Sequence, residues 1–217
     1  MGSLKLTIRL AWRNLWRNHR RTLIMLAAIV VGSWAMIFMT ALMRGMVDEM
    51  VKDGISVLPG HVQIHHPDFR DDPTISNVIA PPGAELEGAL EDPAVVAWTT
   101  RVKVPAVISS ERDTRGVTLI GIDPESEAPI SFVADDMAEG RFIESREDKG
   151  LVVGRKLLER LEPDLGKRVV IMSQDQENEI ADRGFRIVGV FDSKLVQYEE
   201  GFVFAGESTL QLSLIHI

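Results

Sequence analysis

Two short stretches of this sequence carry residue types that could perform metal or phosphate chemistry. In the first, three histidines precede three aspartates: His61, His65, His66, Asp68, Asp71 and Asp72. Imidazole and carboxylate groups are common zinc ligands. Residues 60–66 alternate, with Val62 and Ile64 as the apolar positions, and this pattern predicts a strand. On a strand His61 and His65 would share one face and His66 the other, so we interpret the group as a solvated strand edge.

The second stretch, residues 150–156, reads GLVVGRK. It lacks the GxxxxGK[ST] order that cradles a phosphate, so this chain hydrolyses no nucleotide by that route. GxSxG and HExxH are also absent from the sequence. Acidic residues such as Asp135, Asp136 and Glu144 are most simply surface groups. With no nucleophile, base and orienting group to combine, we predict a non-catalytic chain without a metal or cofactor site.

Composition excludes several classes of protein. The chain has 217 residues, of which 45% are apolar and 26% charged, so disorder is not its main state. It has no cysteine and therefore no disulfide framework. The net charge of −8 argues against a nucleic-acid-binding protein.

The charge is unevenly distributed along the chain. Residues 1–22 hold six basic residues and no acidic one, which leaves 18 basic against 32 acidic residues in the rest. Residues 23–43 contain no charged residue. A helix of that length spans about 31 Å, which matches a hydrocarbon core of about 30 Å. The sequence therefore predicts a membrane protein with one transmembrane helix, which could continue to about residue 53.

The basic flank sets the orientation of this helix. Because basic segments stay in the cytoplasm, we expect a cytoplasmic N-terminus and an extracytoplasmic main domain. A cleaved signal peptide is the alternative. Its apolar region is usually about 7–15 residues long and ends at a small-x-small site, whereas this run is longer and ends in LMRGM. A retained span fits better.

Residues 1–22 predict a basic amphipathic helix at the cytoplasmic membrane surface. Its apolar side comprises Leu4, Ile8, Ala11, Trp12, Leu15 and Trp16, and its basic stripe Arg9, Arg13, Arg17 and Arg20. Such a helix suits the lipid headgroup layer. Two interpretations remain open: a topology anchor alone, or a docking surface for a cytoplasmic partner through Arg9, Arg13 and Arg17.

Five methionines lie on one predicted face of the span. Met36, Met39, Met43, Met46 and Met50 recur at intervals of three and four residues. Methionine suits surfaces that accept varied apolar partners. Packing against another transmembrane helix is the simpler interpretation; a wall for an acyl chain or other apolar cargo is the alternative.

The remainder, residues 51–211, predicts an α+β domain with a mixed or antiparallel sheet. We expect strands over 95–108, 116–122, 151–153, 168–172 and 185–191, and helices over 84–90 and after Gly154. In the last strand Phe185, Ile187 and Phe191 are expected on a common side.

Several stretches resemble one family. Residues 11–23, AWRNLWRNHRRTL, resemble the start of bacterial ABC transporter permeases of the FtsX/MacB/LolC-LolE type. The outer part is similar to the MacB-like periplasmic domain of that family through LIGIDPE (119–125), GRF (140–142), GLVVGRKLL (150–158), LGKRV (165–169) and FRIVGVF (185–191).

The resemblance implies a function and partners. Family members have four spans, pair with an identical or homologous permease, and are driven by a cytoplasmic ABC ATPase on a separate chain. Motion of the spans reaches the periplasmic domain, which moves lipoprotein, drug or peptide cargo toward a periplasmic acceptor. It also implies the bacterial inner membrane, with membrane lipid around the span and no nucleic acid partner.

The chain departs from the family pattern at its C-terminal end. It stops at LSLIHI, residues 212–217, so we expect that segment to be non-native read-through and the periplasmic domain to be incomplete. Alone, such a chain would insert as a one-span anchor without transporting. The alternative function is a single-span membrane-anchored periplasmic binding or sensory module.

Overall fold

The computed structural model describes residues 2–74, 76–174, 179–193 and 195–212. The chain divides into two compact units, Met1–Asp53 and Gly54–Ile217. Of the segment 212–217, expected to be read-through, all but Leu212 lies outside the described residues.

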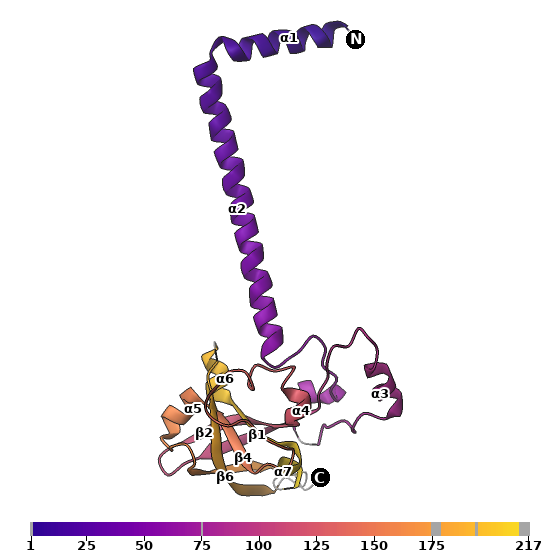
Figure 1. Cartoon of the computed structure of the whole chain (residues 1–217), viewed down its shortest axis with the longest axis vertical. Helices are drawn as coiled ribbons and strands as arrows, with labels where there is room; N and C mark the ends of the chain where they lie inside the picture. Colours follow the sequence, from indigo (N-terminus) through magenta and orange to yellow (C-terminus); the bar gives the residue numbers. More distant parts are fainter. Residues whose placement is uncertain (1, 75, 175–178, 194, 213–217) are drawn as a thin grey trace. The chain divides into compact units, whose positions relative to one another are not determined.

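The first unit consists of helices. Helix α1 covers Gly2–Arg17 and helix α2 covers His19–Val57, so α2 runs past the unit boundary. Figure 1 shows a sharp bend between them. At this bend Asn18 leaves the helical conformation and the Thr22 hydroxyl donates to the Leu15 carbonyl at 2.7 Å. The 39 residues of α2 give a rod of about 58 Å, which exceeds the thickness of a hydrocarbon core.

The second unit begins with an irregular segment. A 3-10 helix, η1, covers Pro67–Arg70, and α3 covers Ala84–Leu90 as predicted. The strand predicted over 60–66 is wrong: Val62 is 82% exposed and no residue of 60–66 is in a strand. An alternating pattern becomes a strand only where a neighbouring strand completes its hydrogen bonds, and no strand pairing of the described residues includes this segment.

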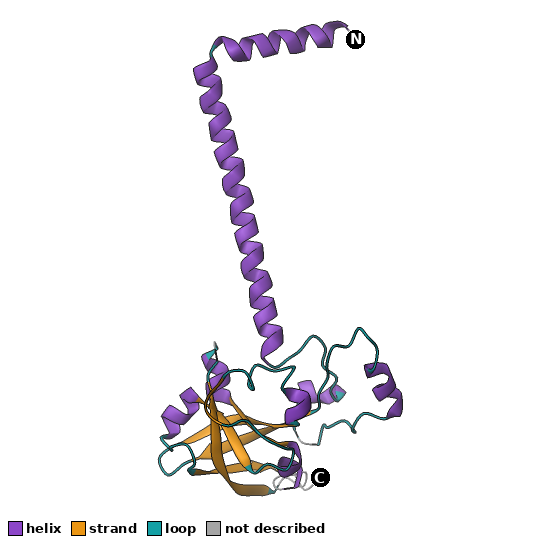
Figure 2. Ribbon diagram, in the orientation of Figure 1, coloured by secondary structure: helices purple, strands orange, loops and turns teal. Residues whose placement is uncertain are grey.

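Among the described residues, a mixed sheet of seven strands forms the body of the second unit, as the sequence indicated. Its order is β3-β6-β4-β7-β2-β1-β5, and β5 also pairs with β6, which closes six strands into a ring (Figure 2). The strands are β1 Arg101–Ser109, β2 Thr114–Ile122, β3 Met137–Gly140, β4 Gly150–Gly154, β5 Arg168–Gln174, β6 Ile180–Phe191 and β7 Phe202–Gly206. The predicted strand 95–108 thus begins only at Arg101.

The two faces of this sheet bury separate clusters. The inner cluster draws aliphatic side chains from all six strands of the ring, including Leu119, Leu151 and Ile187. The outer cluster includes Ile120, Val152 and Phe204, which alternate with inner residues along their strands. Where both faces are covered, as along β4 and β7, the strand is a continuous run of buried residues. In β1 and β5 buried residues alternate with exposed ones, because no outer cluster covers them.

In the part of the chain that the structure describes, short helices connect or flank the strands. They are α4 Pro124–Glu127, α5 Arg155–Leu161, α6 Val196–Gly201 and α7 Glu207–Leu210. Helix α5 buries Leu157 and Leu161 in the inner cluster, as its spacing predicted. Glu162 ends α5 in the left-handed conformation (φ 55°).

The prediction that Phe191 shares a side with Phe185 and Ile187 is wrong. Phe185 and Ile187 lie in the inner cluster, whereas Phe191 lies in the outer one. The pairing of β4 with β6 shifts between Leu151↔Ile187 and Val152↔Gly189, which leaves an additional residue in β6. A bulge of one residue moves every following side chain to the opposite face.

Candidate membrane span and partner surfaces

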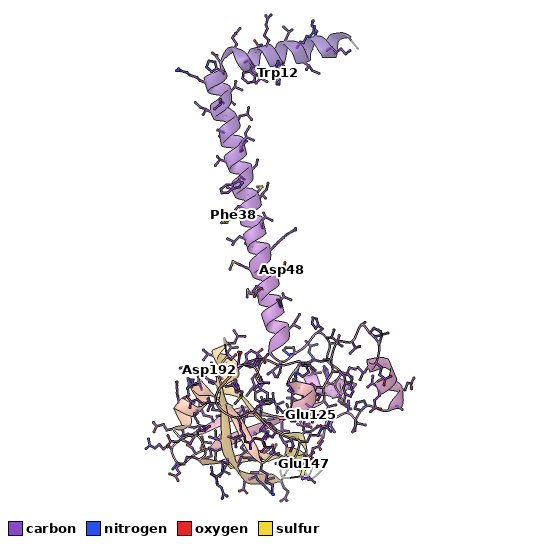
Figure 3. The ribbon with its side chains drawn as sticks, in the orientation of Figure 1. Trp12, Phe38, Asp48, Glu125, Glu147 and Asp192 are labelled. Carbon is purple, nitrogen blue, oxygen red and sulfur yellow. The ribbon has the colours of Figure 1, made fainter. Side chains whose placement is uncertain are left out.

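Helix α2 carries the apolar surface that could lie in a membrane. Within the described residues, one helical stretch, His19–Lys52, is long and apolar enough to cross a bilayer. Its most apolar window is 0% buried, so this is not the covered core helix of a soluble protein. Figure 3 shows its side chains projecting freely, with Phe38 inside the uncharged stretch and Asp48 beyond it.

The five methionines follow one side of α2. All are strongly exposed, at 74, 65, 70, 61 and 72% for Met36, Met39, Met43, Met46 and Met50 respectively. Met46 and Met50 come after Arg44, outside the uncharged stretch. The apolar stripe therefore continues from the predicted span into a segment where charged residues occupy the other sides of the helix. No described residue of the first unit covers it.

Helix α1 presents the three arginines proposed for docking. Arg9, Arg13 and Arg17 are all exposed on α1, and the Trp12 and Trp16 rings meet edge to face with centroids 6.1 Å apart. Arg20 does not continue this stripe, because α1 ends at Arg17 and Arg20 belongs to α2.

The stretch GLVVGRKLL builds a packed junction. Gly154 ends β4, and a Cβ there would lie 2.3 Å from the Glu199 carbonyl oxygen. The buried Glu199 carboxylate accepts from the Lys156 backbone N–H at 3.2 Å and from the Ser193 N–H at 2.8 Å. One carboxylate thereby joins the start of α5 to the loop after β6. These residues serve packing, and the stretch forms no phosphate cradle.

Arg155 adds an ion-pair bridge to this junction. Its Nε lies 2.6 Å from Asp192 Oδ1 and its Nη1 2.9 Å from Glu139 Oε1. Hydrogen bonds to Asp192 and Glu139 raise the pKa of Arg155, so the guanidinium stays charged. The bridge joins the ends of β3 and β6 to the start of α5.

The stretch GRF supports the edge strand β3. Gly140 has φ +78°, and a Cβ there would lie 2.2 Å from the Val188 carbonyl oxygen. Arg141 pairs with Asp148, with Nη1 2.5 Å from Oδ2. Burial alone would raise the pKa of Asp148, but hydrogen bonds from Arg141 and from the N–H groups of Glu144 and Gly150 outweigh it and lower that pKa.

The stretch LIGIDPE leads from β2 into two charged contacts. Asp123 Oδ2 lies 2.7 Å from Arg146 Nη2, and this hydrogen bond lowers the pKa of Asp123. The nearly buried Glu207 lies 3.9 Å from the same arginine. Burial raises the pKa of Glu207, Arg146 opposes that rise and Asp123 adds to it.

A buried ion pair, which the sequence analysis did not single out, lies close by. Glu127 is 0% exposed and accepts from Arg101 Nε at 2.8 and 3.1 Å. The two residues are 26 positions apart, on α4 and β1. The only sequence signal is an arginine at the start of an apolar strand.

The histidine-aspartate stretch does not assemble as a metal site. His65 Nδ1 lies 2.9 Å from the His66 carbonyl oxygen, and the His66 ring accepts from the Asp68 N–H. Among the described residues, no three His, Cys, Asp or Glu side chains gather closely enough to hold an ion. An open hollow of about 460 Å³ here is lined by Gln63, His65, Phe69, Arg70 and Pro73.

A match to a family model agrees with the resemblance read from the sequence. The family model described as the MacB-like periplasmic core domain matches residues 22–215. A similar solved structure is the extracellular domain of the noncanonical ABC-type transporter YknZ from Gram-positive bacteria, at 15% identity and a TM-score of 0.45, covering 65% of this chain and 71% of that one. No curated protein matches the chain.

Proposed function

We propose a transport function from one premise: the chain belongs to the MacB-like periplasmic core domain family, found in ABC transporter permeases, whose model spans residues 22–215. The proposed role is that of a permease subunit that couples ATP hydrolysis by a separate cytoplasmic ATPase to movement of the second unit, here named the sheet domain, for export or lipoprotein release. The family match carries this proposal, and the wholly exposed apolar surface of α2 supports it.

In this proposal α2 crosses the inner membrane, with α1 on the cytoplasmic side and the sheet domain outside. The six basic residues before the span support that orientation. Because the chain has no cysteine, single introduced cysteines can be labelled to determine this orientation. Thr114→Cys should react with a membrane-impermeant maleimide in intact spheroplasts, and Asn14→Cys only after lysis. The reverse pattern would overturn the orientation.

The basic side of α1 is proposed to dock the ATPase. Replacing Arg9, Arg13 and Arg17 by glutamine should reduce co-purification of the ATPase at least about tenfold if three charge-assisted contacts are lost. The control removes the same charge from exposed arginines of the sheet domain, Arg70, Arg168 and Arg183. Equal loss in both variants would show a general charge effect and reject the docking role.

The methionine side of α2 is proposed to face a second transmembrane helix, with the acyl-chain wall as the alternative. Met43→Cys should then crosslink to the partner permease or a neighbouring span. Ala41→Cys is the matched control, because two residues along a helix turn the side chain to the opposite side. A photoreactive residue at position 43 that captures only lipid or acylated cargo would instead support the alternative.

The sheet domain is proposed as the mechanical element that moves cargo toward a periplasmic acceptor. Depletion of the native transporter from cells would distinguish between two classes of cargo. Retention of acylated lipoproteins in the inner membrane would indicate lipoprotein release, whereas increased sensitivity to drugs or peptides would indicate export. Normal growth, lipoprotein sorting and resistance on depletion would contradict both.

A further inference from the structure

The residue that follows α2 is buried in the core of the sheet domain. Helix α2 ends at Val57, and the next residue, Leu58, is 4% exposed and belongs to the outer cluster beside the sheet. Gly60 then turns the chain, with its N–H donating to the Ile55 carbonyl at 3.0 Å. The chain therefore leaves the helix directly into a packed position.

A single guanidinium holds the main chain at this point. Arg101, the first residue of β1, donates through Nη1 to the Leu58 carbonyl oxygen. The same guanidinium forms an ion pair with the Glu127 carboxylate, with Nη2 2.8 Å from Oε1 and Nε 2.8 Å from Oε2. Arg101 thus links the exit of α2 to both β1 and α4.

The backbone of Glu127 is held by hydrogen bonds that do not involve Arg101. Its backbone carbonyl accepts from the N–H groups of Ile130 and Ser131 at 2.9 and 3.0 Å, and its side chain is fully buried. A second cation, Lys103, lies nearby on β1. Burial and Arg101 lower the pKa of Lys103, and Glu127 acts in the opposite direction. The Glu127 carboxylate therefore interacts electrostatically with both Arg101 and Lys103.

The cost of burying these charges argues for a role beyond stability. Replacing a buried ion pair by apolar residues of similar size is often neutral or stabilising, so such a pair is weak evidence for a stabilising role. An apolar replacement of Arg101 could fill the space but could not donate to the Leu58 carbonyl. What the pair specifically provides is a fixed position for the main chain.

We propose that Arg101, oriented by Glu127, is the joint through which displacement of α2 enters the sheet domain. This inference rests on the proposed transport function. Arg101 acts as a positioning residue: it holds the main chain at Leu58, so that force along α2 is delivered to β1 and α4 rather than lost in a loose loop.

The joint is tested first without reference to transport. A nitroxide on Pro59→Cys reports the mobility of the chain next to Leu58 in the membrane-inserted protein. We expect a restricted spectrum in the parent protein and a mobile component with Arg101→Met or Glu127→Gln. Val104→Ala, a buried change on the same strand, controls for loss of stability and should leave the spectrum restricted. An unchanged spectrum in both charge variants would overturn the joint.

Coupling is tested in the native transporter assembled with its ATPase in vesicles. Arg101→Met should retain ATP hydrolysis within about twofold while export per ATP hydrolysed falls at least about tenfold. Val104→Ala should change neither the rate of ATP hydrolysis nor the export per ATP hydrolysed. Unchanged export per ATP in Arg101→Met would reject the coupling role even if the nitroxide is mobile. If ATP drives neither export nor lipoprotein release by the parent transporter, the proposed function fails, whereas the nitroxide result still decides whether the joint exists.

Discussion

Gly154 lies directly against the main chain of Glu199: a Cβ on Gly154 would meet the Glu199 Cα at 2.4 Å and its carbonyl oxygen at 2.3 Å. This contact brings α6 to the end of β4, where the Glu199 carboxylate can reach the first turn of α5. The glycine in GLVVGRKLL is thus required by packing between two elements.

Gly154→Ala should therefore strongly destabilise the sheet domain. Forcing an additional carbon into a packed contact costs about 1–3 kcal/mol when backbone must move. This cost lowers the melting temperature by roughly 2–12 °C in a domain of this size. Thermal unfolding followed by circular dichroism measures it. Gly184→Ala on β6 is the control, because a Cβ there meets no atom within 4 Å. Equal melting temperatures for both variants would show that the contact is absent.

Glu127→Gln should cost more stability than removal of both charges. The single change leaves the Arg101 guanidinium buried without its counter-charge, at a cost of about 3–5 kcal/mol, whereas Arg101→Met with Glu127→Leu replaces the pair by apolar groups. Chemical denaturation of the two variants measures the difference. Lys156→Met removes the exposed pair with Glu159 and should leave the free energy of unfolding nearly unchanged, because exposed ion pairs contribute little. A double variant less stable than Glu127→Gln would contradict this.

Asp148→Asn should weaken the domain at neutral pH only. Because the folded-state pKa of Asp148 is lowered, its ionised form contributes stability above the unfolded pKa of about 3.9. That contribution is lost as pH falls through the folded pKa. The gap in melting temperature between parent and variant should therefore be full near pH 7 and shrink below about pH 4. Asp135→Asn, the same change at an exposed aspartate outside this cluster, controls for general acid effects. A gap independent of pH would reject the role of the charge.

Glu207→Gln should show the opposite dependence. The folded-state pKa of Glu207 is raised, chiefly by burial, so its stabilising form is the protonated one. That stability is fully present below the unfolded pKa and is lost as pH rises through the folded pKa. The neutral glutamine should therefore raise the melting temperature above pH 7, by about 2–4 °C for each kcal/mol recovered, and lose the advantage near pH 4. A variant less stable than the parent at pH 8 would contradict the sign.

Local patterns made much of the fold predictable. The apolar run of α2 and the short helix 84–90 depend on sequence periodicity and composition, and both are found. The burial of Leu157 and Leu161 on α5 followed from helical spacing in the same way. The identity of the domain came from the order of several stretches, each of which is uninformative alone.

The features that could not be predicted depend on contacts between residues far apart in the sequence. Ile187 and Phe191 share a strand and an even spacing, yet a bulge in the pairing with β4 sends Phe191 to the other cluster. Residues 60–66 alternate like a strand but have no partner among the described pairings. Likewise, nothing near Arg101 in the sequence indicates Glu127 or Leu58 as its partners, because the topology alone brings them together.

In the proposed function this chain is a permease subunit driven by a separate ATPase. The most direct measurement is purification of the native transporter from bacterial membranes through an affinity tag on this subunit, in mild detergent or in nanodiscs. We predict that a nucleotide-binding subunit co-elutes in a fixed ratio and that the complex hydrolyses ATP. Elution of the subunit free of any ATPase under all these conditions would contradict the claim and favour a membrane-anchored periplasmic module.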